Sequence, residues 1–237
     1  MLTHENLQFS LAILWSIVGF GGYYYLSQRI PGKSRFANMS PILDRQGNLV
    51  LMRRILGVLF LGGCTLLIIR LLPGPSLFEY GISFRFRSAP PWWIWLLIPL
   101  IPILGYASTL TPVTLEHYPQ IRARHWTPAM IVLSSCSWVV FLIAYELFFR
   151  GFLLFSFLQH MDPVPAIALN TAVYAFAHFF KGRAEIFGAI PVGIIFCYVT
   201  LVTGNFWTAA ILHILMALSN EWFSLRAHPE MTIVRAS

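Results

Sequence analysis

The stretch Phe141–Phe157, FLIAYELFFRGFLLFSF, decides the fold, because it is apolar enough for a membrane-spanning helix and yet contains two charges. Glu146 and Arg150 stand four residues apart, so a helix places them on one face, where they can pair. An ionisable side chain at the centre of a membrane helix costs about 2.5–3.5 kcal/mol. The pair therefore indicates a functional site, and a structural salt bridge between helices is the alternative. Gly151 follows directly and is expected to permit close approach of another helix.

The rest of the chain has the composition of an integral membrane protein. Of its 237 residues, 57% are hydrophobic and 11% are charged, whereas soluble domains contain about 25% charged residues. The apolar runs predict an all-α bundle of seven spans, or eight if the long fourth run holds a short pair of helices. Each run is close to the roughly 20 residues that a helix needs to cross a membrane. The predicted spans are Leu7–Ser27, Leu51–Leu72, Trp92–Ser108, Pro128–Leu158, Pro165–Phe180, Phe187–Thr203 and Phe206–Phe223.

The first of these runs is expected to be a transmembrane helix and not a removable signal, because it lacks a basic stretch and a small-residue cleavage site. Cys64, Cys136 and Cys197 all lie in predicted spans and are expected to act as small apolar side chains. No Cys/His cluster or HExxH motif is present in the sequence, so neither a metal nor another cofactor is expected.

The net charge of +7 raises the question of nucleic-acid binding, but the distribution of the charges favours a membrane. With seven spans, four basic groups fall on one side, and Arg85 and Arg87 lie on the other. This bias predicts a multi-pass protein of the inner or plasma membrane, with the N-terminus outside and the C-terminus in the cytoplasm. Attraction to anionic lipids explains the charge without nucleic acid. The four groups are Arg29, Lys33, Arg35, Arg45, Arg53 and Arg54; Arg122 and Arg124; Lys181 and Arg183; and Arg226 and Arg235.

We expect one membrane domain over residues 1–237, with N-terminal helices up to residue 127 and a catalytic core over residues 128–224. His178 stands near the end of the fifth span, and Glu185 follows seven residues later. Their simpler interpretations are an interfacial hydrogen-bonding histidine and a solvated loop charge. His213 and Asn220 are separated by seven residues, two helical turns, and therefore share a face of the last span. Either alone is also a plausible helix-packing hydrogen-bonder.

Together these polar side chains can perform hydrolysis. A carboxylate and an imidazole can act as general base and acid on water, and imidazole and amide donors can stabilise an oxyanion. No serine or cysteine stands beside a base in an evident nucleophile arrangement, so water is the simpler nucleophile. A proton-coupled transporter is the competing class, because Glu/His relays occur in such proteins.

Three short motifs, YELFFRGFLL, FAH and AAILHILMA, occur in this order in the chain. They resemble the CAAX prenyl endoprotease and bacteriocin-processing family of glutamic intramembrane proteases, over approximately Ile131 to Phe223. The family pattern is Glu-Glu-x-x-x-Arg, then Phe-x-x-x-His, then His-x-x-x-Asn or Asp. The resemblance implies an α-helical bundle of about eight helices that opens toward the membrane. It also implies cleavage of a membrane-associated peptide or protein; membrane lipids and this substrate are the expected partners.

By this resemblance, Glu146 and Arg150 match the second Glu and the Arg of the first motif, and His178 and His213 match the two histidines. In the family, a Glu and the first His are thought to activate water, while the second His and the Asn support the oxyanion. Three positions differ: the first Glu is Tyr145, the Phe is Tyr174 and the last Asn or Asp is Ala217.

These departures leave two interpretations open. In an active enzyme, Asn220 supplies the missing amide, Glu146 or Glu185 is the base, and Tyr145 adds an auxiliary hydrogen bond. The chain is also similar to a divergent branch of the family. That branch has an aromatic residue before the Glu, a GK pair and a Glu after the His, and the similarity implies the same set of site residues. In the other interpretation, the chain is a catalytically inactive binding or immunity protein on the same scaffold.

Overall fold

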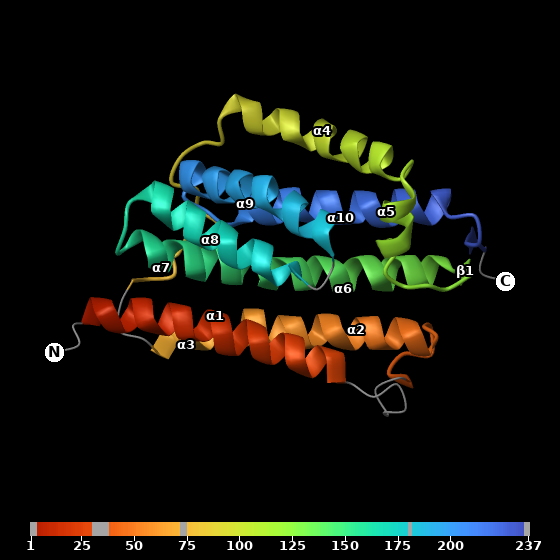
Figure 1. The fold of residues 1–237 in the computed structure, drawn as a ribbon, viewed down its shortest axis with the longest axis horizontal. Helices are drawn as coiled ribbons and strands as arrows, with labels where there is room; N and C mark the ends of the chain where they lie inside the picture. Colours follow the sequence, from red (N-terminus) through yellow and green to blue (C-terminus); the bar gives the residue numbers. More distant parts are fainter. Residues whose placement is uncertain (1–3, 30–37, 72–74, 180–181, 235–237) are drawn as a thin grey trace. The chain divides into compact units, whose positions relative to one another are not determined.

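The computed structural model describes residues 4–29, 38–71, 75–179 and 182–234, and in these ranges the chain is predominantly helical (Figure 1). The all-α prediction is confirmed. Two short parallel strands of two residues each pair with one another, with His125 opposite Thr232 and Trp126 opposite Ile233. The elements are α1 His4–Arg29, α2 Arg45–Gly57, η2 Val58–Cys64, α3 Thr65–Leu71, α4 Trp92–Ser108, α5 Pro112–His117, β1 His125–Trp126, α6 Pro128–Glu146, η3 Leu147–Leu153, α7 Leu154–Leu158, α8 Pro163–Ala177, α9 Arg183–Thr203, α10 Trp207–Ala227 and β2 Thr232–Ile233.

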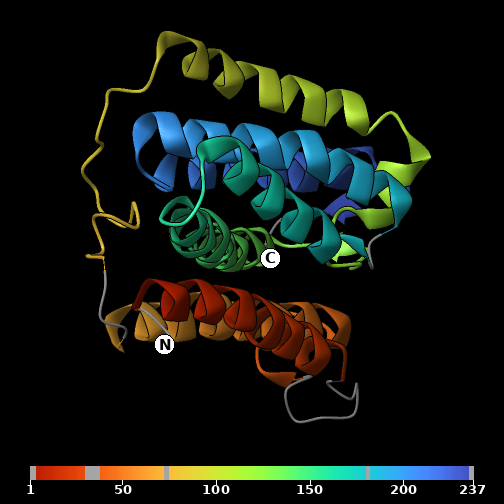
Figure 2. The same ribbon diagram turned by 60° about the vertical axis from the view of Figure 1, so that its left-hand side comes forward.

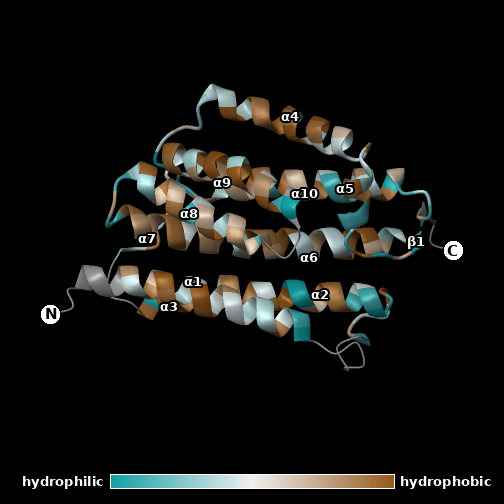
Figure 3. Ribbon diagram, in the orientation of Figure 1, coloured by the Kyte–Doolittle hydropathy of each residue, from teal (hydrophilic) through white to brown (hydrophobic). Residues whose placement is uncertain are grey.

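Within the described ranges, four helical segments are long and apolar enough to cross a membrane: Phe9–Arg29, Arg45–Leu71, Pro128–Leu158 and Glu185–Thr203. The helices Trp92–Ser108 and Pro163–Ala177 are apolar but shorter. Figure 3 shows apolar residues along most of α4 and α9, which suits contact with lipid. The predicted number of seven or eight spans stays a prediction, as does the seventh span, although α10 is a helix of 21 residues.

Two predicted boundaries change. The second helical segment begins at Arg45, six residues before the predicted start at Leu51, so Arg45 itself lies in α2. The long fourth run is continuous helix from Pro128 to Leu158, through α6, η3 and α7, and not a pair of helices.

The orientation of the termini and the division of the chain near residue 127 stay predictions. Several residues used for these predictions lie outside the described ranges: Lys33, Arg35, Leu72, Phe180, Lys181 and Arg235.

The chain forms two compact units. The first comprises Met1–Tyr25, Val58–Pro91 and Ile143–Ala210, and the second comprises Leu26–Gly57, Trp92–Leu142 and Ile211–Ser237. In the first unit, η3 lies at the centre and contacts η2, α3, α7, α8 and α9. Helices α8 and α9 lie side by side in both views (Figures 1 and 2). In the second unit, an apolar core forms around Leu43, Val50, Ile121, Trp126, Met130 and Leu225.

Glycine explains how α8 and α9 pack so closely. A Cβ at Gly193 of α9 would lie 3.1 Å from Cγ2 of Thr171 and 3.2 Å from Cδ1 of Tyr174, both on α8. A larger residue at this position would therefore push α9 away from the Tyr174 ring. Gly151 also permits a close approach, but its neighbour is the 75–91 loop, at Ile82 and Tyr80, and not the helix that was expected.

Candidate active site

Glu146 and Arg150 form a buried ion pair in the first unit. Nη1 of Arg150 lies 3.1 Å from Oε2 of Glu146 and 3.3 Å from Oε1, and both side chains have no exposed surface. The predicted pairing is therefore confirmed. Both residues belong to one continuous helical segment, so the bond does not by itself join two helices. Glu146 ends α6, and Arg150 lies in the middle of η3, a π-helical segment. Wider π turns inside α-helices are frequent at functional sites.

The Arg150 guanidinium is enclosed by aromatic rings from three elements. Its Cζ lies 4.2 Å from the centre of the Tyr174 ring of α8, 5.4 Å from that of Phe196 of α9 and 5.6 Å from that of Phe149 of η3. A cation over an aromatic face is attracted by the ring quadrupole, and the attraction is strongest where water is excluded. The energetic cost of burying the Arg150 charge in the first unit is therefore offset by the Glu146 carboxylate and by these aromatic rings.

His178 lies beside this cluster. It follows the last residue of α8, Ala177, and its backbone N–H donates to Ala175 O at 3.0 Å. Its ring centre lies 4.7 Å from that of Tyr174, and Nδ1 lies 2.9 Å from Tyr174 O. A carbonyl oxygen only accepts, so Nδ1 is the nitrogen that carries the hydrogen. In the neutral ring, Nε2 is then the nitrogen that can take a proton from water.

Tyr145 packs against the same cluster, and Glu185 lies in the same unit. The Tyr145 ring is 7% exposed and packs edge-on against Tyr174, with 6.0 Å between the ring centres. Glu185 is in the first turn of α9 and partly buried, and not in a loop. The first unit therefore brings together the predicted Glu146, Arg150 and His178, with Tyr145 packed beside them, and it also contains Glu185.

His213 and Asn220 lie on the part of α10 that belongs to the second unit, so their convergence with Glu146 stays a prediction. His213 is 8% exposed, and Asn220 is partly buried. Between them on the same stripe, Ala217 packs against Trp138 and Leu142 of α6. Asn220 borders α4, since its Oδ1 would lie 3.2 Å from a Cβ at Gly105. The polar stripe thus runs along the seam where α10 meets α4 and α6.

The second unit also contains a buried polar cluster that the sequence motifs do not single out. Glu221 is 1% exposed and accepts hydrogen bonds from the Gln120 backbone N–H at 3.0 Å and from Ser134 Oγ at 3.3 Å. Arg54, 4% exposed, donates to Ser134 O at 2.7 Å and to Gln120 Oε1 at 2.9 Å. The sequence does contain a signal for this cluster, because Glu221 is an ionisable residue in an apolar run, as Glu146 is.

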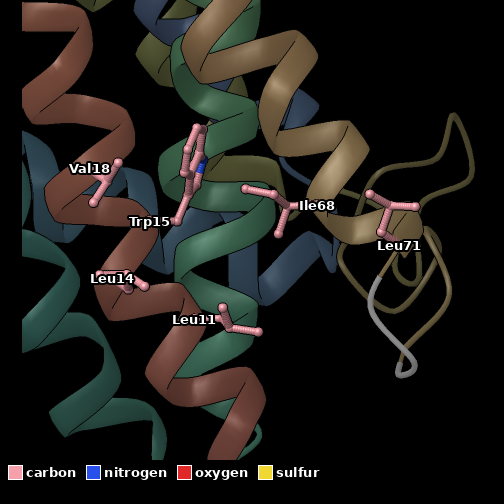
Figure 4. A pocket seen from close by; sticks show the side chains of 6 residues that line it. All are labelled: Leu11, Leu14, Trp15, Val18, Ile68 and Leu71. Carbon is pink, nitrogen blue, oxygen red and sulfur yellow. The ribbon is translucent and has the colours of Figure 1, made fainter.

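An apolar groove of about 220 Å³ lies between α1 and α3 (Figure 4). Its lining holds no acid or base, so it is not a candidate catalytic centre. Trp15, which borders the groove, donates from Nε1 to Thr65 Oγ1 at 2.9 Å and so ties α1 to α3. The lining residues are Leu11, Leu14, Trp15, Val18, Ile68 and Leu71. No group of three or more potential metal ligands occurs within the described ranges.

Comparison with known proteins agrees with the motifs. Residues 124–219, less than half of the chain, match the model of the family described as type II CAAX prenyl endopeptidase Rce1-like. No curated protein and no solved structure matches the chain. The match covers Glu146, Arg150, His178 and His213 but ends one residue before Asn220. It indicates CAAX-type peptide hydrolysis as the kind of function, in an integral membrane protein. Residues 124–219 are therefore similar to the Rce1-like family of type II CAAX prenyl endopeptidases.

Proposed function

We propose that the protein is an intramembrane endopeptidase of the glutamic type, which cleaves a membrane-associated peptide or protein without a metal. The observation that carries the proposal is the cluster of Glu146, Arg150, Tyr174 and His178 in the first unit, inside the segment that matches the family. A buried carboxylate and an imidazole with a fixed tautomer are the groups that general acid–base hydrolysis requires.

In the proposed reaction, the carboxylate of Glu146 or of Glu185 takes a proton from water while the water oxygen attacks the carbonyl carbon of the scissile bond. Nε2 of His178 accepts a hydrogen bond from the same water and orients it. Where Glu185 is the base, Glu146 holds Arg150 in place. The proton then passes to the amide nitrogen as the carbon–nitrogen bond breaks, and the products are a carboxylic acid and an amine. His213 and Asn220 are assigned the role of stabilising the oxyanion, as the family resemblance implies. Tyr145 adds an auxiliary hydrogen bond.

A binding protein on the same scaffold is the second candidate, and two observations favour it. Tyr145 occupies the position of the first family Glu, and the Glu146 carboxylate is held by Arg150 with no exposed surface. A proton-linked transporter is the third class, and it would give pH-dependent flux in liposomes without proteolysis.

The test is turnover of a quenched-peptide library by the purified protein in detergent. Glu146→Gln, Glu185→Gln, His178→Gln and His213→Gln are compared with wild type, and the exposed Glu230→Gln is the matched control. Loss of general acid–base catalysis lowers turnover by about 10²–10⁴-fold. We expect this loss in Glu146→Gln and His178→Gln, and none in Glu230→Gln.

Thermal unfolding of each variant separates lost chemistry from lost folding. His178→Gln is the decisive variant, because His178 is not part of the Glu146–Arg150 ion pair. Full turnover in His178→Gln and Glu146→Gln would overturn the site assignment. A wild type that cleaves no peptide and no membrane-protein substrate, yet is folded, would favour the binding protein.

A further inference from the structure

Asn170 is buried on α8 at the point where α8 faces the π-helical segment. Its side chain is 0% exposed, and its Nδ2 donates to the backbone carbonyl of Phe149 at 2.8 Å. Phe149 directly precedes Arg150. The same carbonyl also accepts from the backbone N–H of Leu154, five residues further along the chain. A bond over five residues is the π-helical register, which is rarer than the α-helical register over four.

The orientation of the Asn170 amide is set on its other side by Cys197 of α9, whose Sγ donates to Asn170 Oδ1 at 3.1 Å. Since Oδ1 accepts from this thiol, the NH₂ group is directed at Phe149 O, which can only accept. One buried chain of hydrogen bonds thus joins α9, α8 and η3. It ends on the peptide group that connects Phe149 to Arg150.

The position of Arg150 depends on this peptide group. A π turn contains one residue more than an α turn, so a return to α register would rotate every following side chain around the helix. Arg150 would then move relative to both Tyr174 and Glu146. The Asn170 bond stabilises the peptide group at which this change of register would occur.

We propose that Asn170, held by Cys197, is a positioning residue that keeps the π turn of η3 in place and so aims Arg150 at Glu146 and Tyr174. The inference rests on the proposed function, since it assigns Asn170 a role in the same reaction. Asn170 touches no reacting atom in this role. Its loss should lower kcat and leave KM close to its wild-type value.

The experiment compares Asn170→Leu with Asn205→Leu, because the chain offers a matched buried asparagine. Asn205 is also 0% exposed and donates to a backbone carbonyl, Arg85 O, at 3.1 Å, but it lies at the turn between α9 and α10. Asn205→Leu loses the bonds to Ser83 O and Arg85 O and the bond from the Trp207 N–H, so it should lower Tm at least as much as Asn170→Leu does. We expect kcat to fall about 10- to 100-fold only in Asn170→Leu, as a misplacement of about 1 Å can cause. Cys197→Ala, a milder change, should give a smaller fall in kcat.

Hydrogen exchange of the 147–158 amides provides a readout that does not depend on activity. Exchange there should accelerate in Asn170→Leu and stay at the wild-type rate in Asn205→Leu, because the π-register bond of Leu154 is weakened only in the first. Unchanged exchange in Asn170→Leu would overturn the inference, whether or not the protein is an enzyme. So would equal falls in kcat for the two asparagine variants. The proposed function fails separately, if His178→Gln and Glu146→Gln retain full turnover in the same assay.

Discussion

The guanidinium carbon of Arg150 lies 4.2 Å from the centre of the Tyr174 ring, and both side chains are buried in the first unit. Tyr174 occupies the position at which the family pattern has Phe, so the aromatic ring is the shared feature. We therefore expect Arg150 to require the ring face of Tyr174 and not its hydroxyl group.

Replacement of Tyr174 should distinguish the ring from the hydroxyl. Tyr174→Phe keeps the aromatic face, whereas Tyr174→Leu removes an attraction worth about 2 kcal/mol at a desolvated site. We expect the free energy of unfolding to fall by at least that amount more in the Leu variant than in the Phe variant. Denaturation in detergent micelles measures both. Equal losses would show that the hydroxyl group is the important part of Tyr174.

The Glu146–Arg150 pair should behave as a coupled unit. Removal of one partner leaves a buried charge, at a cost of about 3–5 kcal/mol. Glu146→Gln and Arg150→Met should each destabilise the fold by roughly this amount, and the double variant by clearly less than the sum. A double-mutant cycle on the free energy of unfolding measures the coupling. Additive losses would contradict a direct interaction.

Glu221 should stabilise the second unit although no motif contains it. Glu221→Gln replaces one acceptor oxygen with an NH₂ group, so either the Gln120 N–H or the Ser134 hydroxyl loses its acceptor. A buried donor without an acceptor lowers the free energy of unfolding by about 1–3 kcal/mol. Thermal unfolding of Glu221→Gln is compared with that of Glu230→Gln. Glu230 is exposed, so its replacement should change the free energy of unfolding by at most about 0.5 kcal/mol.

The fold class and the central ion pair could be predicted from the sequence because each follows from local chemistry. Long apolar runs specify membrane helices, and a spacing of four residues places Glu146 and Arg150 on one face. The tautomer of His178 could not be predicted in this way, since it depends on where α8 ends and brings Nδ1 to Tyr174 O. The π-helical register of η3 likewise depends on Asn170, 21 residues further along the chain.

The errors have the same origin. Arg54 was counted among the basic groups on one side of the membrane, but its hydrogen bonds to Ser134 and Gln120, both more than 60 residues away in the sequence, hold it inside the second unit. Gly151 was expected against a helix and meets the 75–91 loop. Composition within a short window carries no information about such distant partners.

Gly105 provides a test of the polar stripe on α10. A Cβ at this position of α4 would lie 3.0 Å from Cβ of Ser219 and 3.2 Å from Oδ1 of Asn220, closer than ordinary contacts. Gly105→Ala should therefore destabilise the fold by about 1–3 kcal/mol, as overpacking does, and displace Asn220. The matched control is Gly188→Ala, because nothing lies within 4 Å of a Cβ there. Alanine in a helix is favoured over glycine by about 0.5–1 kcal/mol, so the control should be neutral or stabilising. If Asn220 supports the oxyanion, Gly105→Ala should also lower kcat by more than its loss of folded protein explains. Normal turnover per folded molecule would remove Asn220 from the proposed site and leave His213 as the donor on α10.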